Sequence, residues 1–95
     1  MMLLAIMCVD KDGSIDLRMK TRPLHLEWLK NNLPPGAFVG PLLSENGEDF
    51  RGSLYILEFP SIKKANVWLA GEPYYKAELF KSVMIYPTRN ILPMN

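Results

Sequence analysis

The residues best suited to chemistry lie in and just before the segment TRPLHLEWL, residues 21–29. Arg18, Arg22 and His25, the only histidine, are spaced four and three residues apart. On a helix this spacing places the three side chains on one face. Two guanidinium groups next to an imidazole can bind a carboxylate or a phenolate and place a titratable base beside it. The alternative is a solvated polar helix face on which the histidine is incidental.

Glu72, in the segment EPYY, is the carboxylate best placed to meet that imidazole. It follows the end of a predicted helix, and a residue before proline is held in an extended conformation. The direction of the Glu72 side chain is therefore expected to be fixed. Because the helix before Glu72 should lie beside the helix of His25 on the same sheet face, we expect the two side chains to meet in a partly buried cleft and to form a hydrogen bond. The alternative is a surface loop glutamate, with the adjacent tyrosines packed on the edge of a sheet.

The only cysteine, Cys8, offers a different combination, in which a thiol nucleophile uses His25 as its base. Cys8 lies within the apolar run MLLAIMCV, and a thiol inside an apolar strand is normally inert packing. One histidine and one cysteine without carboxylates at ligand spacing do not indicate a metal site. The sequence carries no cofactor motif, so we expect neither a metal nor a cofactor.

Residues 8–19, CVDKDGSIDLRM, resemble part of a calcium-binding EF-hand loop. With Gly13 at the sixth position, Asp10 and Asp12 fall at the third and fifth, as they should. The first and twelfth positions are then Cys8 and Met19, which cannot replace the carboxylates that a hard cation needs. We therefore expect a turn between a strand and a helix, and no calcium binding.

The bulk composition predicts one soluble domain spanning residues 1–95. The net charge of +1 gives no electrostatic footprint for nucleic acid or for an acidic membrane, so neither is an expected partner. The single cysteine excludes an internal disulfide and favours a reducing compartment, the cytoplasm. The N-terminal apolar run ends at Asp10 after nine residues, too short to span a membrane, and it lacks a basic leader.

The elements that must position these residues follow the order strand, helix, strand, strand, helix, strand. Their expected ranges are residues 2–9, 15–32, 37–43, 51–59, 60–71 and 82–87, the last strand being stopped by a proline. A short turn or helical piece lies between residues 72 and 80. This order is typical of an α+β, ferredoxin-like fold, with a four-stranded antiparallel sheet and two helices on one face.

The first predicted helix contains Pro23, which either kinks it or lies in the first turn of a helix that starts near Thr21. Spacings of four, three and four predict an apolar face made of Leu17, Thr21, Leu24 and Trp28. The Gly40-Pro41 pair inside the second strand predicts a bulge or an edge position.

Both faces of the predicted sheet are apolar. In the first strand Leu4, Ile6 and Cys8 alternate with further apolar residues, and residues 54–59 behave in the same way. Two helices can cover only one face, and a large exposed apolar face is unusual on a monomer. We therefore expect a homodimer in which two sheets pack face to face.

With these residues in place, the sequence resembles the YciI-like (YCII-related) family over residues 3–87. The motifs that carry the resemblance are VDKDGS, LRMKTRPLHLEWL, GPLL, GSLYILEF, the Ala65 and Trp68 pair, EPYYKAELF, and Val83, Ile85 and Pro87. Each motif is weak alone, but their order and spacing together are specific. The resemblance implies a ferredoxin-like subunit that pairs into a dimeric α+β barrel.

The family also implies a cleft that holds a histidine and an aspartate as an acid–base pair. His25 matches that histidine, and Glu72 stands where the family has the aspartate of a DPY motif, with an arm longer by one methylene. Glu78 stands where members usually have glycine. Within the matching motifs, Ser53 and Tyr74 join Arg18 and Arg22 as candidate substrate-binding residues.

Two functions remain open at this point. The first is a small-molecule enzyme in which His25 and Glu72 act in acid–base catalysis while Arg18 or Arg22 neutralises an anionic substrate or intermediate. Isomerase or lyase chemistry on an anionic or aromatic metabolite fits this site. The second is a non-catalytic, dimeric ligand-binding or assembly module in which the same pair holds a helix to a loop.

Overall fold

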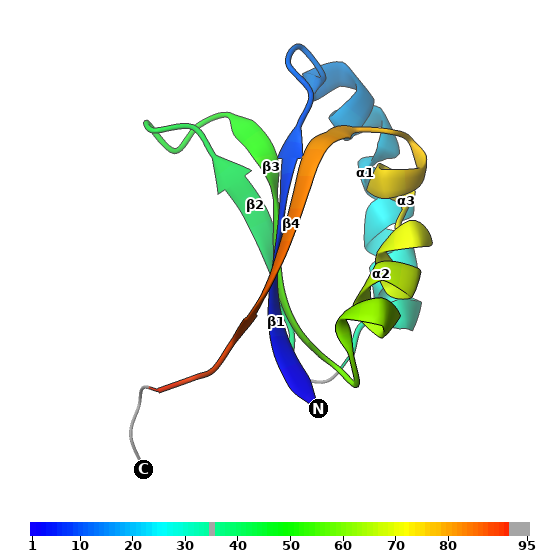
Figure 1. Ribbon diagram of the computed structural model, residues 1–95. Coiled ribbons are helices and arrows are strands. Elements are labelled where there is room, and N and C mark those ends of the chain that lie inside the picture. The colour runs from blue at the N-terminus through cyan, green and yellow to red at the C-terminus, as the bar shows by residue number, and fades with distance from the viewer. Residues whose placement is uncertain (35, 92–95) are drawn as a thin grey trace.

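Four strands form one antiparallel sheet, and the helices all cover the same face of it (Figure 1). The computed structural model describes residues 1–34 and 36–91. The elements are β1 (Met2–Asp10), α1 (Ile15–Asn32), β2 (Phe38–Leu43), β3 (Phe50–Phe59), α2 (Ile62–Ala70), α3 (Pro73–Lys76) and β4 (Phe80–Thr88). The strand order is β2-β3-β1-β4, so β1 and β3 are central. The predicted α+β, ferredoxin-like arrangement is confirmed, with α3 as a short addition.

The core lies between the sheet and the helices. On β1, Leu4, Ile6 and Cys8 are fully buried, and they alternate with half-buried neighbours because successive strand residues face opposite sides. Leu4 pairs with Leu57 and Ile6 with Tyr55 on β3, so the two central strands share this buried face. Fully burying one such aliphatic side chain contributes about 1.5–3 kcal/mol.

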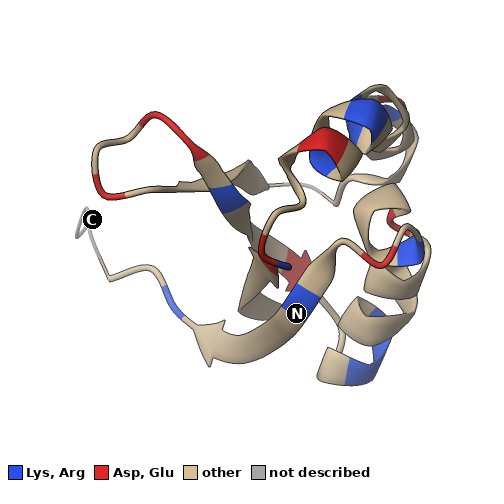
Figure 2. Ribbon diagram, turned by 90° about the horizontal axis from the view of Figure 1, so that it is seen from above, with Lys and Arg blue, Asp and Glu red and all other residues tan. Residues whose placement is uncertain are grey.

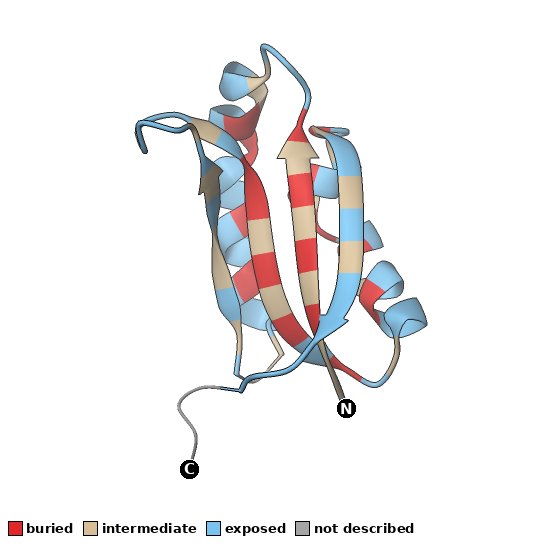
Figure 3. Ribbon diagram, turned by 60° about the vertical axis from the view of Figure 1, so that its left-hand side comes forward, coloured by how far each residue is buried: buried red, intermediate tan, exposed pale blue. Residues whose placement is uncertain are grey.

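The opposite face of the sheet is also apolar, and no element covers it (Figure 3). It carries Leu3, Ala5, Met7 and Val9 from β1 and Leu54 and Ile56 from β3, all of them half-buried. The edge strands add Phe38, Met84 and Tyr86, whose exposed fractions are 52%, 43% and 61%. We call this surface the open sheet face. The prediction that both faces are apolar is confirmed.

Prolines occur in both edge strands, where a missing backbone donor is tolerated. Gly40 and Pro41 lie in β2, so their predicted edge position is confirmed, and the pairing with β3 shifts register just beyond them. The prediction that Pro87 stops the last strand was wrong. Pro87 pairs with Leu4, and β4 continues to Thr88 along the other edge.

The helix α1 is assigned continuously from Ile15, so Pro23 lies in its interior rather than in a first turn. The predicted apolar face was partly wrong, because Leu24 is 65% exposed. The residues that α1 buries are Arg18, Thr21, His25 and Leu29. Their spacing also forms a helical stripe. Arg18 and His25 can lie on the buried stripe because carboxylates of the sheet and of α3 meet them there.

The helices α2 and α3 follow each other almost directly and lie beside α1 (Figure 1). The side chain of Ser61 caps α2 by accepting a hydrogen bond from the Lys64 N–H at 3.1 Å. The indole N–H of Trp68 donates to the carbonyl of Asn32 at 2.6 Å, which ties α2 to the end of α1. Among the described residues, no helix combines the length and the apolar composition that crossing a membrane requires.

Candidate active site

His25 and Glu72 meet between α1 and α3. The Nδ1 atom of His25 lies 2.6 Å from Oε1 of Glu72, and the two side chains are 47 positions apart in the sequence. Glu72 is fully buried, and His25 is 6% exposed. The structure thus brings together the two residues in which the sequence predicted an acid–base pair.

The local sequence fixes the direction of Glu72. Because Pro73 follows it, Glu72 has an extended backbone (φ −71°, ψ 128°) and forms the N-cap of α3. Its carboxylate accepts a hydrogen bond from the Tyr74 N–H at 3.3 Å and turns back toward α1. One residue therefore begins a helix and orients an imidazole.

Three groups form hydrogen bonds with the Glu72 carboxylate. The hydroxyl of Tyr55 donates to Oε2 at 3.1 Å, and the Tyr74 N–H shares Oε1 with His25. Burial, and next the charge of Glu72, raise the pKa of Tyr55, so its phenol keeps its proton as a donor. An ionised Glu72 accepts a hydrogen bond from Nδ1–H of His25, which leaves the lone pair of a neutral imidazole on Nε2.

The Nε2 atom faces open space. No hydrogen bond occupies it in the described residues, yet every sealed side-chain nitrogen or oxygen there has a partner. His25 lines a pocket of about 240 Å³ between α1, the β2–β3 edge of the sheet and α3. The polar lining comprises Arg18, Arg22, His25, Ser53 and Tyr74. The apolar lining includes Leu26, Leu29, Val39, Pro41 and Phe50.

Arg18 is part of the pocket wall, and its hydrogen-bonding groups are largely occupied. Its Nη1 donates to both carboxylate oxygens of Asp10 at 3.1 and 3.0 Å, and its Nη2 donates to Ser53 at 2.9 Å. Arg18 is 4% exposed and Asp10 is 9% exposed. Burial raises the pKa of Asp10, and the charge of Arg18 opposes that rise. The positive charge of Arg18 is thus already matched inside the protein.

Arg22 lies one helical turn further along, at the mouth of the same pocket. It is exposed, and among the described residues no carboxylate comes within ion-pair distance of it. The exposed Leu26 adjoins it on the rim. The sequence treated Arg18 and Arg22 as equivalent anchors for an anion, whereas the structure leaves only Arg22 without an internal partner of opposite charge.

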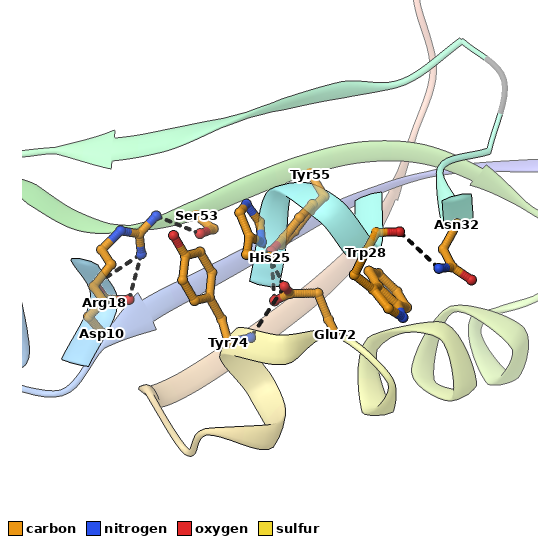
Figure 4. A network of polar contacts seen from close by, with 9 residues as sticks. All are labelled: Asp10, Arg18, His25, Trp28, Asn32, Ser53, Tyr55, Glu72 and Tyr74. Atoms are coloured by element: carbon orange, nitrogen blue, oxygen red, sulfur yellow. Dashed lines mark hydrogen bonds and ion pairs between the residues drawn. The ribbon is translucent and has the colours of Figure 1, made fainter. Parts of the chain in front are cut away.

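Tyr74 connects the two charged pairs. Its ring stacks on the His25 ring with centroids 4.0 Å apart and planes 18° apart. The Arg18 guanidinium carbon lies 4.6 Å from the centre of the same ring. Figure 4 shows the Tyr74 ring standing between Arg18 and His25, with its hydroxyl directed away from Glu72.

Asp10 and Tyr55 contribute to the site but were not among the predicted site residues. The alternation that buries Leu4, Ile6 and Cys8 continues to Asp10, so the pattern of β1 places this carboxylate on the buried face. Tyr55 similarly lies in register on the buried face of β3. A polar group at a core position of a strand is the signal that could have identified both, since such a group needs a partner.

Cys8 lies on the same buried face of β1 as Asp10, where a thiol is normally inert. It is fully buried, and burial, followed by the charges of Glu72 and Asp10, raises the pKa of its thiol to about 12. The described residues contain no cluster of three or more side chains that could hold a metal ion. Asp10 of the EF-hand-like segment is turned inward to Arg18 instead.

These features define a class: a ferredoxin-like α+β domain with a buried His–carboxylate pair that opens into a small, largely apolar pocket. The model of the YCII-related domain matches residues 2–89. The chain belongs to the YCII-related domain family. It is 31% identical to Protein YciI of Escherichia coli and of Shigella flexneri, over 95% of this chain and 99% of each relative.

Solved structures carry the same fold. The structure of 5-chloro-2-hydroxyhydroquinone dehydrochlorinase from Burkholderia phenoliruptrix, in complex with 2,5-dihydroxybenzoquinone, superposes with a TM-score of 0.82 at 25% identity. The match covers 94% of this chain and 95% of the other. A protein from Agrobacterium tumefaciens matches with a TM-score of 0.55 at 17% identity, over 94% and 92% of the two chains, and shares the fold alone.

Proposed function

We propose that this protein is a small-molecule enzyme in which Nε2 of His25 removes a proton from its substrate. The observation that carries the proposal is the arrangement of one imidazole: Nδ1 is fixed by the buried Glu72, and Nε2 is open to the pocket. A base held in one tautomer and one orientation is what general base catalysis requires. Glu72 stabilises the imidazolium that forms.

The pocket indicates the size and charge of the substrate. A cavity of about 150 Å³ is enough to hold benzene, so 240 Å³ suits one substituted ring. Arg22 at the mouth favours an acidic group on that ring. The similarity to a dehydrochlorinase that binds a dihydroxybenzoquinone supports isomerase or lyase chemistry on an anionic or aromatic metabolite.

Proton removal can be measured without knowing the product. Hydroxylated and chlorinated hydroquinones are incubated with the protein in D₂O, while proton NMR follows exchange of ring hydrogens and an electrode follows chloride release. We expect exchange with the native chain and its loss in His25→Gln. Glu27→Gln, which changes an exposed carboxylate of the same helix, serves as the control and should retain it. Exchange that persists in His25→Gln would refute the proposal.

A non-catalytic ligand-binding or assembly module is the second candidate. It is favoured by the position of Glu72, whose three hydrogen bonds tie α1, β3 and α3 together and would stabilise the fold in any case. Binding of ring anions without exchange or turnover would support this alternative.

We further propose a homodimer formed through the open sheet face. Its apolar residues come from all four strands. Figure 2 shows few charged residues on the strands, and of these Glu58, which pairs with Leu3, lies on the open sheet face. A stable contact needs about 1,200 Å² of total buried surface or more. Met84→Glu, on the open sheet face, should shift sedimentation toward the monomer, whereas Val67→Glu on α2 should not. A monomeric native chain at micromolar concentration would refute the dimer.

The cytoplasm is the proposed location, supported by the free thiol of Cys8. Cell fractionation tests it, and recovery of the protein outside the cytoplasmic fraction would contradict it.

A further inference from the structure

Tyr74 combines three roles in the site, of which the stacking and the backbone hydrogen bond are already described. The third concerns its hydroxyl. Tyr74 is 1% exposed, and its hydroxyl has no hydrogen-bond partner among the described residues. Every sealed side-chain oxygen in that part of the chain has a partner, so the hydroxyl must reach open space. The pocket that Tyr74 lines is the space available to it.

The Tyr74 hydroxyl and the His25 imidazole therefore face the same pocket. Because the two rings stack nearly parallel at 4.0 Å, a ligand that approaches Nε2 of His25 also comes close to the Tyr74 ring. Figure 4 shows the hydroxyl on the side of Arg18 and Ser53, away from the Glu72 carboxylate that holds His25. Nε2 of His25 can accept a proton, and the hydroxyl of Tyr74 can donate a hydrogen bond.

The surroundings keep Tyr74 a donor. Burial raises its pKa, while the charge of Arg18 opposes the rise and the charge of Glu72 adds to it. A phenol that stays protonated cannot be the base, but it can donate to an oxygen that becomes negative. The neighbouring Arg18 is less suited to stabilising such an oxygen, because it already donates hydrogen bonds to Asp10 and Ser53.

We propose that the Tyr74 hydroxyl donates a hydrogen bond to the substrate oxygen on which negative charge develops when His25 removes a proton. In that step a C–H bond of the ring ligand breaks and its proton forms an N–H bond at Nε2. The electron pair moves into a new C=C bond, and the conjugated carbonyl becomes an enolate oxygen. Tyr74 stabilises that oxygen from within the pocket, and Arg22 neutralises the ligand's acidic group at the mouth.

This inference rests on the proposed function, because it names the donor that complements the His25 base. It also fixes the ligand class: a single planar ring with an oxygen that is, or becomes, an anion. A mainly structural Tyr74 would need its ring but not its hydroxyl. The two roles are therefore separable by a change that removes one oxygen atom and keeps the stacking.

The test compares Tyr74→Phe with Tyr75→Phe, the same substitution at the adjacent tyrosine, which is 45% exposed and does not line this pocket. The probe is 2,5-dihydroxybenzoquinone, a coloured acid whose binding is followed by its visible absorbance. A hydrogen bond to a charged group is worth about 1.5–3 kcal/mol, so Tyr74→Phe should weaken binding about 10- to 100-fold. Tyr75→Phe should bind as the native chain does. Equal affinity in Tyr74→Phe and the native chain would overturn the inference.

A second measurement uses the unaltered protein, so that it does not depend on the variant folding. Affinities are measured for phenolates of similar size and increasing basicity. An anion that accepts a hydrogen bond from Tyr74 should bind more tightly as its basicity increases. A flat series, or no binding of any ring anion, would overturn the inference. Weakened binding in Tyr74→Phe together with no deuterium exchange in the native chain would retain the hydrogen bond from Tyr74 to a bound ring anion, but would reject the proposed catalysis and the part of that bond in it.

Discussion

Two buried carboxylates contact the same face of α1, and they use it differently. The Asp10 carboxylate accepts hydrogen bonds from Arg18, which also donates to Ser53 inside the protein. The Glu72 carboxylate is hydrogen-bonded to Nδ1 of His25, and Nε2 of the same ring faces the pocket. Both pairs are buried and both lie beside Tyr74. The difference lies in the atom that remains available, since only the second pair leaves a reactive atom facing a ligand.

This comparison teaches that charge and burial alone do not identify the working pair. Breaking a buried pair leaves an uncompensated charge, so both pairs affect stability. Only a pair with an atom open to the pocket can also affect chemistry. Removing Arg18 should therefore act mainly on folding, and changing Glu72 should act on folding and on the imidazole.

The largest expected effect on stability follows from Arg18→Met. It leaves the Asp10 carboxylate buried without its partner, and removing one member of a buried pair typically costs about 3–5 kcal/mol. Urea denaturation should show that decrease in the unfolding free energy. The double variant Asp10→Leu with Arg18→Met, which removes both charges, should recover most of it. A double variant as unstable as the single one would contradict this view of the pair.

The largest expected effect on chemistry follows from Glu72→Gln. The amide oxygen can take the place of Oε1 and accept from both Nδ1 and the Tyr74 N–H, so the tautomer is kept, but the negative charge that stabilises the imidazolium is lost. Any proton-transfer rate should fall at least about 100-fold. Nitrogen NMR of the single histidine should show the proton still on Nδ1, so that a slower rate reports the lost charge and not a changed tautomer. A rate equal to that of the native chain would show that the charge of Glu72 does not assist proton transfer.

The pH dependence of stability should separate the effect of burial on Asp10 from that of Arg18. A carboxyl whose pKa is raised on folding binds its proton more tightly when folded, so its contribution falls as pH rises above about 4. Burial raises the pKa of Asp10 and Arg18 opposes this. In Arg18→Met the charge that opposes the rise in the Asp10 pKa is gone, so the loss of stability relative to the native chain should increase as the pH rises above about 4. A loss of stability that does not change with pH would contradict the role of burial in raising the Asp10 pKa. The control is the double variant Asp10→Leu with Arg18→Met, in which neither residue carries a charge.

A smaller effect is expected from a carboxylate that belongs to neither pair. Glu78 is exposed and has a φ of 59°, a left-handed conformation that glycine adopts without strain. Glu78→Gly should raise the unfolding free energy by about 0.5–1 kcal/mol, net of the greater freedom of glycine in the unfolded chain. Glu78→Ala, which keeps the strain, should bring no gain. Thermal denaturation of both variants measures the difference.

The smallest effect is expected at Cys8, which lies beside both pairs. With its pKa raised to about 12 and its side chain fully buried, the thiol should not react with a disulfide reagent at pH 8 while the protein is folded. Reaction should begin only in the urea range where the protein unfolds. Rapid labelling of the folded protein would show that the region around both pairs opens locally.

Much of the fold could be predicted because alternation and turn chemistry are local. The apolar alternation of β1 and β3 gave both faces of the sheet, and Ser61 and Gly71 marked the ends of α2. The stripe on α1 was harder to predict. Hydrophobicity favoured burying Leu24, whereas the protein buries His25 and Arg18, whose partners lie on other elements and cannot be identified from helical spacing.

The spacing of the motifs was enough to indicate the family and the order of the elements. The pairing of His25 with Glu72 was expected from the family resemblance and from the two helices lying side by side on one sheet face, and the structure brings these side chains together. Only the tertiary structure decided which cation is left for a ligand. Arg18 and Arg22 are the same residue type one helical turn apart, and they differ because Asp10 and Ser53 lie opposite the first and not the second. That difference arises from packing between distant segments.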